Sequence, residues 1–161
     1  MKNEQDLRDV LRMYPTGVTV ITTQGADGPY GMTANSFTPV SLDPPLVLVC
    51  AMRHGLGAAM ISANGHFAVN VLAAEQEAIS RFFSAGRPHG CEAFAEVPHR
   101  RLVTGAPVIE GVTAYLDCSV TTESEAGDHI IFIGEVLAHG SHSSIRSPLI
   151  FFDGRYQALQ G

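Results

Sequence analysis

The sequence predicts a mainly β protein with a few short helices, whose antiparallel strands form a closed or nearly closed barrel. Apolar segments of strand length recur along the chain, and clusters of Gly, Pro, Asn and Asp separate them. Most connections are too short for a parallel crossover, and closure of the sheet would remove exposed edges. With 161 residues and no linker or repeat, the chain is expected to form one domain over residues 1–161.

The N-terminal third is expected to contain one helix and three strands. Asn3 can cap the helix, and Leu7, Val10 and Leu11 fall on one of its faces. The strands are expected over residues 17–23, 30–37 and 46–52. The third strand is continuously apolar, which predicts burial on both of its faces.

The rest of the chain is expected to add two helices and four strands. One helix lies near residues 56–62 and ends at Asn64-Gly65, and the other covers residues 75–83. Residues 84–101 are expected to be a long excursion with little regular structure. The four strands are expected over residues 66–73, 112–124, 129–141 and, as a single strand with a tail, 147–159.

Charge and hydropathy exclude several classes of partner. A net charge of -6 and a pI near 5.5 argue against a nucleic-acid partner. The longest clear apolar run, residues 44–52, falls short of the roughly 18 residues of a membrane span, and the charged N-terminus lacks the apolar core of a signal peptide. We therefore expect a cytoplasmic protein without a membrane partner. Charged residues make up only 16%, which predicts that some surface is buried in an oligomer.

Metal, disulfide and nucleophile chemistry are not indicated. The spacing of Cys50, Cys91 and Cys118 matches no zinc or redox motif, and the odd count argues for free thiols. His139 and His142 lack a third ligand that can be identified, so no metal site is expected. Neither a nucleophile motif nor a pair of carboxylates stands out, so no catalytic residue is predicted.

The segment from Arg53 to Gly57 is the first candidate binding site. A strand ends and a helix begins there, so unpaired backbone N–H groups and Arg53 could hold a phosphate. A glycine-rich turn beside a solvated arginine is the alternative. Gly55 and Gly57 also mimic a dinucleotide-binding motif. However, Met60 replaces its third glycine and the flanking strands are antiparallel, which disfavours a Rossmann domain.

Two further segments place polar groups where a ligand could lie. Hydroxyl and amide groups that could bind a polar heterocycle, or could form the outer face of a half-buried strand, come from Thr33, Asn35, Ser36 and Thr38. His129 follows a tight turn at the start of an apolar strand, with Asp128 beside it. It could contact a ligand at the end of the barrel, or could simply lie at the surface.

These segments, in this order, resemble the flavin reductase-like family of small NAD(P)H:flavin oxidoreductases that serve two-component monooxygenases. The resemblance runs from about Tyr14 to Tyr156 and is carried by YPTGVTVITT, GMTANSFTPVSLDPPLVLVC, HFAVNVLA, GDHIIFIGEV and PLIFFDGRY. It implies an FMN-binding split β-barrel of antiparallel, Greek-key type that forms a homodimer. It also implies reduction of FMN or FAD by NADH or NADPH, with an oxygenase as the partner that receives reduced flavin.

The resemblance also implies which residues contact the two ligands. The flavin ring would lie along the strand around Thr33, with backbone groups from the neighbouring strand, and the phosphate would lie on the loop that begins at Arg53. His129 would lie near the nicotinamide. The implied contact residues are Thr33, Ala34, Asn35, Ser36, Cys50, Ala51, Arg53, His54, Gly55, Leu56, Gly57, Arg81, Phe82, His129, Arg155 and Tyr156.

The phosphate loop departs from the family pattern. Relatives frequently carry serine or threonine where this chain has His54, Gly55 and Gly57. The phosphate would then rest on backbone N–H groups and Arg53, with help from His54. A tightly flavin-bound oxidase of the pyridoxamine-phosphate-oxidase kind, a haem-binding relative and a non-enzymatic flavin carrier remain the alternatives.

Overall fold

A computed structural model describes residues 4–84, 90–142, 144 and 147–159. Its helices are α1 Glu4–Leu11, α2 Leu56–Asn64, the short 3-10 helix η1 Ala74–Gln76, α3 Glu77–Phe83 and α4 Cys91–Phe94. Its strands are β1 Thr16–Gly17, β2 Thr19–Gly25, β3 Gly28–Ala34, β4 Thr38–Leu42, β5 Pro45–Met52, β6 His66–Val71, β7 His99–Arg101, β8 Pro107–Ile109, β9 Ala114–Ala126, β10 His129–Ser141, β11 Leu149–Phe152 and β12 Arg155–Ala158. No helix in these ranges is long and apolar enough to cross a membrane.

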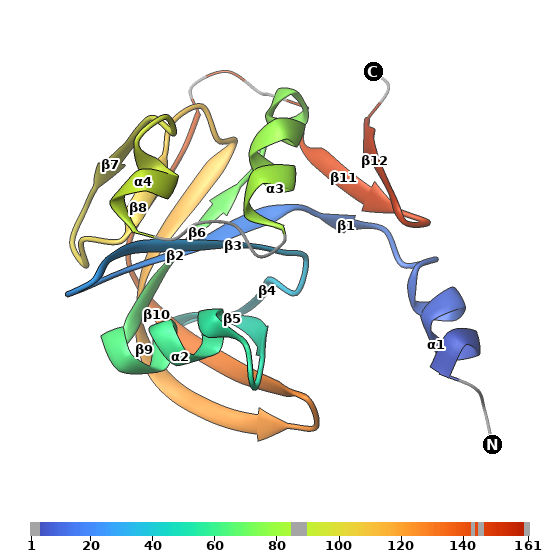
Figure 1. Cartoon of the computed structure of the whole chain (residues 1–161), viewed down its shortest axis with the longest axis horizontal. Coiled ribbons are helices and arrows are strands. Elements are labelled where there is room, and N and C mark those ends of the chain that lie inside the picture. The colour runs from blue at the N-terminus through green and yellow to red at the C-terminus, as the bar shows by residue number, and fades with distance from the viewer. Residues whose placement is uncertain (1–3, 85–89, 143, 145–146, 160–161) are drawn as a thin grey trace.

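A seven-stranded antiparallel sheet in the order β3-β2-β6-β9-β10-β5-β4 forms the body of the molecule (Figure 1). The mainly β, antiparallel class is therefore confirmed. Of the two expected forms, closed or nearly closed, the fully closed barrel is wrong, because β3 and β4 are the two edges of the sheet and do not pair with each other within the described residues. Only residues 35–37 separate these two strands, so at that end the edges lie within roughly 15 Å of each other. The sheet is thus open by one gap.

The longest strands, β9 and β10, form a hairpin that brings distant residues together. They turn at Gly127, which has a φ of 65°, and run antiparallel for 13 residues each. β10 also pairs with β5, and this register places His129 opposite Met52. The start of β10 and the end of β5 therefore lie side by side.

Two apolar clusters cover the two faces of the sheet. Val20 and Ile21 are neighbours on β2 and belong to different clusters, one under α3 and α4 and the other under α2. β5 contributes to the α2 side with Val47, Val49 and Ala51, whereas the two residues between them are only half-buried. The predicted burial of this strand on both faces is therefore wrong for the single chain. Its other face has no covering layer among the described residues.

A buried polar residue attaches the β7–β8 arm to the sheet. The Asn70 amide nitrogen donates to the carbonyl oxygens of Val20 at 3.1 Å and Pro107 at 3.4 Å, and its oxygen accepts from the Ile109 N–H at 2.7 Å. Nearby, the carboxylate of buried Asp117 accepts from Thr104. The described part of residues 84–101 contains α4 and the short strand β7, so the prediction of little regular structure there is only partly right.

Several boundaries differ from the sequence-based expectation. Residues 147–159 form the hairpin β11–β12 and not one strand, with the turn at Asp153 and Gly154. β4 was not predicted. Helix α2 ends as expected, with Gly65 in the left-handed conformation at φ 68°. Asn3, the predicted cap of α1, lies outside the described residues.

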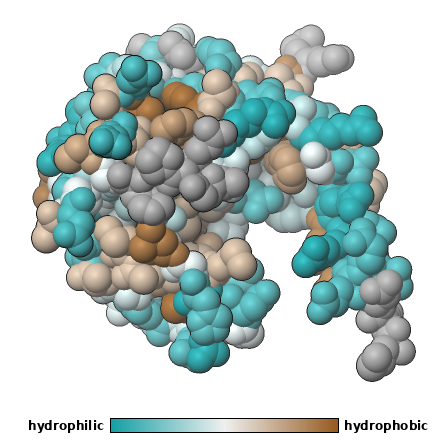
Figure 2. Space-filling view, viewed as in Figure 1, coloured by the Kyte–Doolittle hydropathy of each residue, from teal (hydrophilic) through white to brown (hydrophobic). Residues whose placement is uncertain are grey.

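Helix α1 lies beside the body and buries none of its residues. Figure 1 shows it on the side of β1 and β12, and Figure 2 shows a notch between this part and the rest of the surface. Leu7, Val10 and Leu11 are exposed on it. The Asp153 N–H donates to the Arg12 carbonyl oxygen at 2.9 Å and ties the end of the helix to the β11–β12 turn.

Candidate functional site

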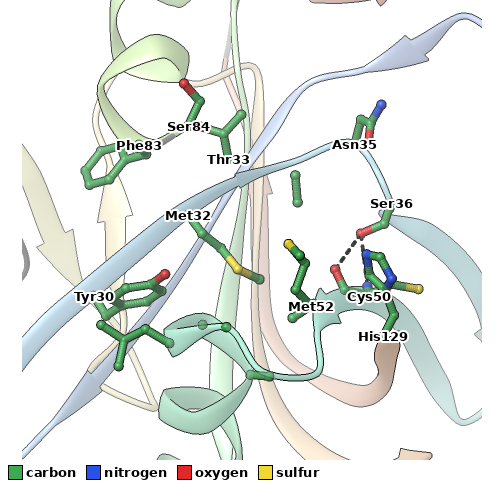
Figure 3. Close-up of a pocket in the computed structure, with 16 residues that line it drawn as sticks. Tyr30, Met32, Thr33, Asn35, Ser36, Cys50, Met52, Phe83, Ser84 and His129 are labelled. Carbon is green, nitrogen blue, oxygen red and sulfur yellow. Dashed lines mark hydrogen bonds between the residues drawn. The ribbon is translucent and has the colours of Figure 1, made fainter. Parts of the chain in front are cut away.

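A cavity of about 310 Å³ opens at the gap between the two edges of the sheet. Its walls are β3, the link after β3, the end of β5, the first turn of α2, the end of α3 and the start of β10 (Figure 3). Most of the positions predicted from the sequence line it. They are Thr33, Ala34, Asn35, Ser36, Cys50, Ala51, Gly55, Leu56, Gly57 and His129.

The first turn of α2 supplies backbone donors to the cavity. Gly55 caps the helix without any side-chain hydrogen bond, and Leu56, Gly57 and Ala58 line the cavity. The first N–H groups of an α-helix have no partner within the helix and carry partial positive charge. This end of the cavity is therefore suited to an anion such as a phosphate.

The glycines of this turn also have a packing role. A Cβ on Gly57 would lie 2.4 Å from the Met32 sulfur, and one on Gly55 would lie 3.1 Å from the Met52 carbonyl oxygen. The lack of side chains therefore lets α2 approach β3 and β5 closely. Both methionines line the cavity, where Figure 3 shows them between β3 and the start of α2.

Ser36 ties the link after β3 to β5. Its hydroxyl donates to the Cys50 carbonyl oxygen at 3.0 Å and accepts from the Cys50 N–H at 2.9 Å. Figure 3 shows both bonds. The Cys50 backbone groups, which the family resemblance implies as ligand contacts, therefore already have a protein partner. Ser36 spans the gap that the sheet leaves open.

The other polar residues of β3 differ in how they are engaged. The Thr33 hydroxyl donates to the Ser80 carbonyl oxygen at 2.6 Å, which joins β3 to α3. Asn35 is exposed, lines the cavity and makes no side-chain hydrogen bond to a described residue. Its amide is thus available to a ligand, whereas the hydroxyls of Thr33 and Ser36 are used within the protein.

Cys50 presents a half-buried thiol to the cavity. Burial raises the pKa of this thiol, so it stays protonated at neutral pH. Cys118, fully buried in the core, has its pKa raised to about 12, first by burial and then by the charge of Asp117. All three cysteines are free, as expected.

His129 is held at the mouth of the cavity by its neighbour. Its Nδ1 lies 2.7 Å from the Asp128 carboxylate. The hydrogen bond from His129, followed by its charge, lowers the pKa of Asp128. Because Nδ1 is engaged, Nε2 is the ring atom left for a ligand.

Arg53 and His54 lie beside the cavity and do not line it. The Arg53 guanidinium lies 3.3 Å from the Glu125 carboxylate on β9, and its backbone N–H donates to the Asp128 carbonyl oxygen at 2.8 Å. Sequence reasoning missed Glu125, although the Gly127 turn predicted that this part of β9 lies beside the start of β10.

Arg81 and Phe82 do not line the cavity either. Arg81 pairs with Glu77 at 2.6 Å and lies 4.8 Å over the Tyr156 ring. Phe82 lines a separate groove between α3 and α4, and Phe83 faces the cavity in its place. One residue turns a helix by about 100°, so neighbouring aromatic residues face different sides.

Tyr156 lies close to the site, in a smaller hollow of about 210 Å³ that shares Thr33 and Asn35 with the main cavity. Its hydroxyl lies 2.8 Å from the Ser80 hydroxyl. Arg155 is exposed on β12 and lines neither space.

Sequence reasoning also missed several lining residues. They are Tyr30, Met32, Met52, Ala58, Phe83 and Ser84. Tyr30 and Met32 could have been found, because strand alternation places them on the same face of β3 as Ala34. The described residues contain no cluster of His, Cys, Asp or Glu that could hold a metal ion.

Comparison with known proteins identifies this arrangement. The model of the flavin reductase like domain matches residues 11–160, which include every wall of the cavity. The chain belongs to the flavin reductase-like family. A family relative named NADH-dependent FAD reductase, from Streptomyces globisporus, is 42% identical over 158 residues, which are 97% of this chain and 86% of that protein.

Two further flavin reductases extend the likeness. One named FMN reductase (NADH), from Agrobacterium fabrum, is 39% identical over 156 residues and covers 96% of this chain and 86% of that protein. A solved structure, the flavin reductase component of a bacterial two-component tryptophan halogenase, superposes with a TM-score of 0.92 at 37% identity and covers 99% of each chain. The flavin reductase fold and sequence therefore extend over essentially the whole chain.

Proposed function

We propose that this chain is an NADH-dependent flavin reductase that reduces FAD or FMN and supplies the reduced flavin to a partner oxygenase. The observation that carries the proposal is the cavity at the start of α2, within a chain of the flavin reductase-like family. The relatives named above are an FAD reductase, an FMN reductase and a reductase component of a two-component system.

The residues of the cavity fit a flavin. Met32, Met52 and Leu56 offer an apolar surface to a planar ring, and the Asn35 amide can bind its polar edge. The first turn of α2 would hold the phosphate, with Arg53 next to it. When both molecules are bound, the nicotinamide supplies a hydride and the flavin accepts it, so the protein has to bind, orient and exclude water.

His129 supports a nicotinamide position at the mouth of the cavity. It stands at the start of β10, where Asp128 fixes one ring nitrogen and leaves the other for a ligand. Its role here is to bind and orient the donor, since hydride transfer needs no protein acid or base.

We also propose a homodimer. Leu7, Val10 and Leu11 leave an apolar face of α1 exposed, and Val40 and Leu42 do the same on β4. A second copy that covered these residues would remove apolar surface that a single chain leaves in water.

NADH is a cytoplasmic electron donor, so we place the reaction in the cytoplasm.

The experiment that tests the function is an assay of the purified chain with FMN or FAD and NADH or NADPH, in all four combinations. We expect loss of the reduced-nicotinamide absorbance that depends on added flavin and is faster with NADH. Absence of turnover in every combination would remove the reductase assignment. A yellow protein that keeps its flavin through gel filtration would instead favour an enzyme with tightly bound flavin.

A further inference from the structure

The side chain that would hold the flavin phosphate is already paired in the protein. Arg53 is two residues before the cap of α2, and its guanidinium lies 3.3 Å from the Glu125 carboxylate. The two side chains are 42% and 65% exposed, so both can move without disturbing the core. The Arg53 backbone is fixed separately, by its bond to the Asp128 carbonyl oxygen.

We propose that Glu125 competes with the flavin phosphate for Arg53 and thereby weakens flavin binding. This inference rests on the proposed function, because it requires that the phosphate of a bound flavin lies at the start of α2. Glu125 lies on β9 and is not among the residues that line the cavity. It would act through Arg53 and not through contact with the flavin ring.

The chemistry of the two anions favours an exchange. A guanidinium binds carboxylates and phosphates with the same fork of N–H donors, so the two groups seek the same face of Arg53. An ion pair between two exposed side chains contributes little, because water and salt screen both charges. Glu125 therefore shifts flavin affinity moderately and does not block the site.

The end of the β9–β10 hairpin adds to the effect by its charge. Glu123, Glu125 and Asp128 are all exposed carboxylates within this short stretch. Glu123 accepts a hydrogen bond from Ser62 of α2 at 2.8 Å and therefore lies on the side of the sheet that α2 covers. An incoming phosphate therefore meets both a competing carboxylate at Arg53 and a negative surface next to it.

Competition of this kind suits an enzyme that must release its product. When a flavin leaves, Arg53 returns to Glu125 and is not left without a counter-ion. Binding of the phosphate breaks the ion pair between Arg53 and Glu125, and this cost reduces the net free energy of binding. The dissociation constant of the flavin is therefore higher than it would be if Glu125 were absent.

The test is to measure dissociation constants of FMN and riboflavin for the wild-type chain and for Glu125→Gln, by quenching of flavin fluorescence at low salt. Riboflavin has the same ring and no phosphate. We expect Glu125→Gln to bind FMN about two- to five-fold more tightly and riboflavin unchanged. Glu123→Gln is the matched control, because it removes the same charge from the same strand but does not pair with Arg53, and its effect should be clearly smaller.

Combination with Arg53→Ala separates the two proposals. If Arg53→Ala weakens FMN more than riboflavin and abolishes the effect of Glu125→Gln, both are supported. If Arg53→Ala weakens FMN selectively but Glu125→Gln leaves FMN binding unchanged or weaker, the competition is disproved and the phosphate site stands. If Arg53→Ala affects both flavins equally, the phosphate site itself is wrong.

Discussion

At the scale of single residues, the cavity combines side chains that the protein already uses with side chains that it leaves to a ligand. Ser36 and Thr33 are bonded to backbone carbonyl groups, whereas Asn35 is not bonded to a described residue. In His129, one ring nitrogen, Nδ1, is bonded to the Asp128 carboxylate. A flavin would therefore meet a preorganised wall with few groups that have to give up existing bonds.

His129→Ala should change both a pKa and a kinetic constant. Without the hydrogen bond and charge of His129, the lowered pKa of Asp128 should return towards its ordinary value, which carboxyl NMR titration measures. The KM for NADH should rise several-fold with a smaller change in kcat. A change confined to flavin affinity would contradict the position given to this residue.

The same pair gives a signed pH dependence. A carboxyl pKa that is lowered on folding contributes stability above the ordinary range of aspartate, and this contribution is lost as pH falls through the lowered value. The difference in unfolding midpoint between wild type and His129→Ala should therefore shrink in acid.

Ser36→Ala should destabilise the protein by about 1–3 kcal/mol, because it leaves the N–H and carbonyl groups of Cys50 without their partner. Urea unfolding measures the loss, and Ser36→Thr, which keeps the hydroxyl, should retain most of the stability. Ser62→Ala, at an exposed hydroxyl, is the control and should stay within about 0.5 kcal/mol. Equal losses in both alanine variants would show that Ser36 does not hold the gap.

At the scale of elements, close approaches at glycine position the walls of the site. A Cβ on Gly31 of β3 would lie 2.8 Å from the Phe83 ring and 3.2 Å from the Phe94 ring. These rings belong to α3 and α4 and are both buried. The two helices can therefore cover this part of β3 only while position 31 has no side chain.

Gly31→Ala should cost about 1–3 kcal/mol in the free energy of unfolding, because two buried rings must shift. The measurement is urea unfolding. Gly17→Ala is the matched control, since a Cβ there meets nothing within 4 Å. Comparable stability of the two variants would mean that α3 and α4 can move away from β3 at little cost.

The sequence predicted elements with strong local signals and missed those that depend on partners. The Asn64-Gly65 stop signal located the end of α2, and the tight turn between two long strand-like segments located β9 and β10. The β11–β12 turn carried a signal that was overlooked, because Asp153-Gly154 is a common hairpin pair. β4 contains Pro39 and is mostly exposed, so its pairing with β5 is visible only in three dimensions.

The sequence predicted some of the residues that line the cavity and missed others. The residues around Thr33 and the glycine turn at α2 line the cavity, since their chemistry and position were both readable. The helix rotation that selects Phe83 over Phe82, and the register that brings Glu125 to Arg53, are set by packing between elements. Neither the rotation of α3 nor this pairing register can be predicted from the residues near each position in the sequence.

At the scale of the whole molecule, the body of the chain folds around the sheet without help from α1. No residue of α1 is buried, and the contact that ties the helix end to the β11–β12 turn comes from Arg12, one residue after it. The exposed apolar face of this helix is therefore better explained by assembly than by folding.

Removal of residues 1–11 should leave the fold intact and abolish the proposed homodimer. Circular dichroism and the thermal midpoint should stay close to those of the full chain, whereas light scattering after gel filtration should change from a dimer to a monomer mass. A full-length chain that is already a monomer, or a shortened chain that remains a dimer, would contradict the role given to α1. Leu11→Glu is a milder variant expected to act in the same direction.

The outer edge of β4 also affects how the protein behaves outside the cell. β4 pairs with β5 on one side, its other backbone groups face no described strand, and Leu42 is 96% exposed. Pro39 removes one donor from this edge, but an uncovered edge of this kind can recruit further chains into aggregates. Association through this edge becomes faster as the protein concentration rises. Concentrated stocks are therefore the ones in which turbidity should develop first, and storage at low concentration should prolong the shelf life of the purified protein.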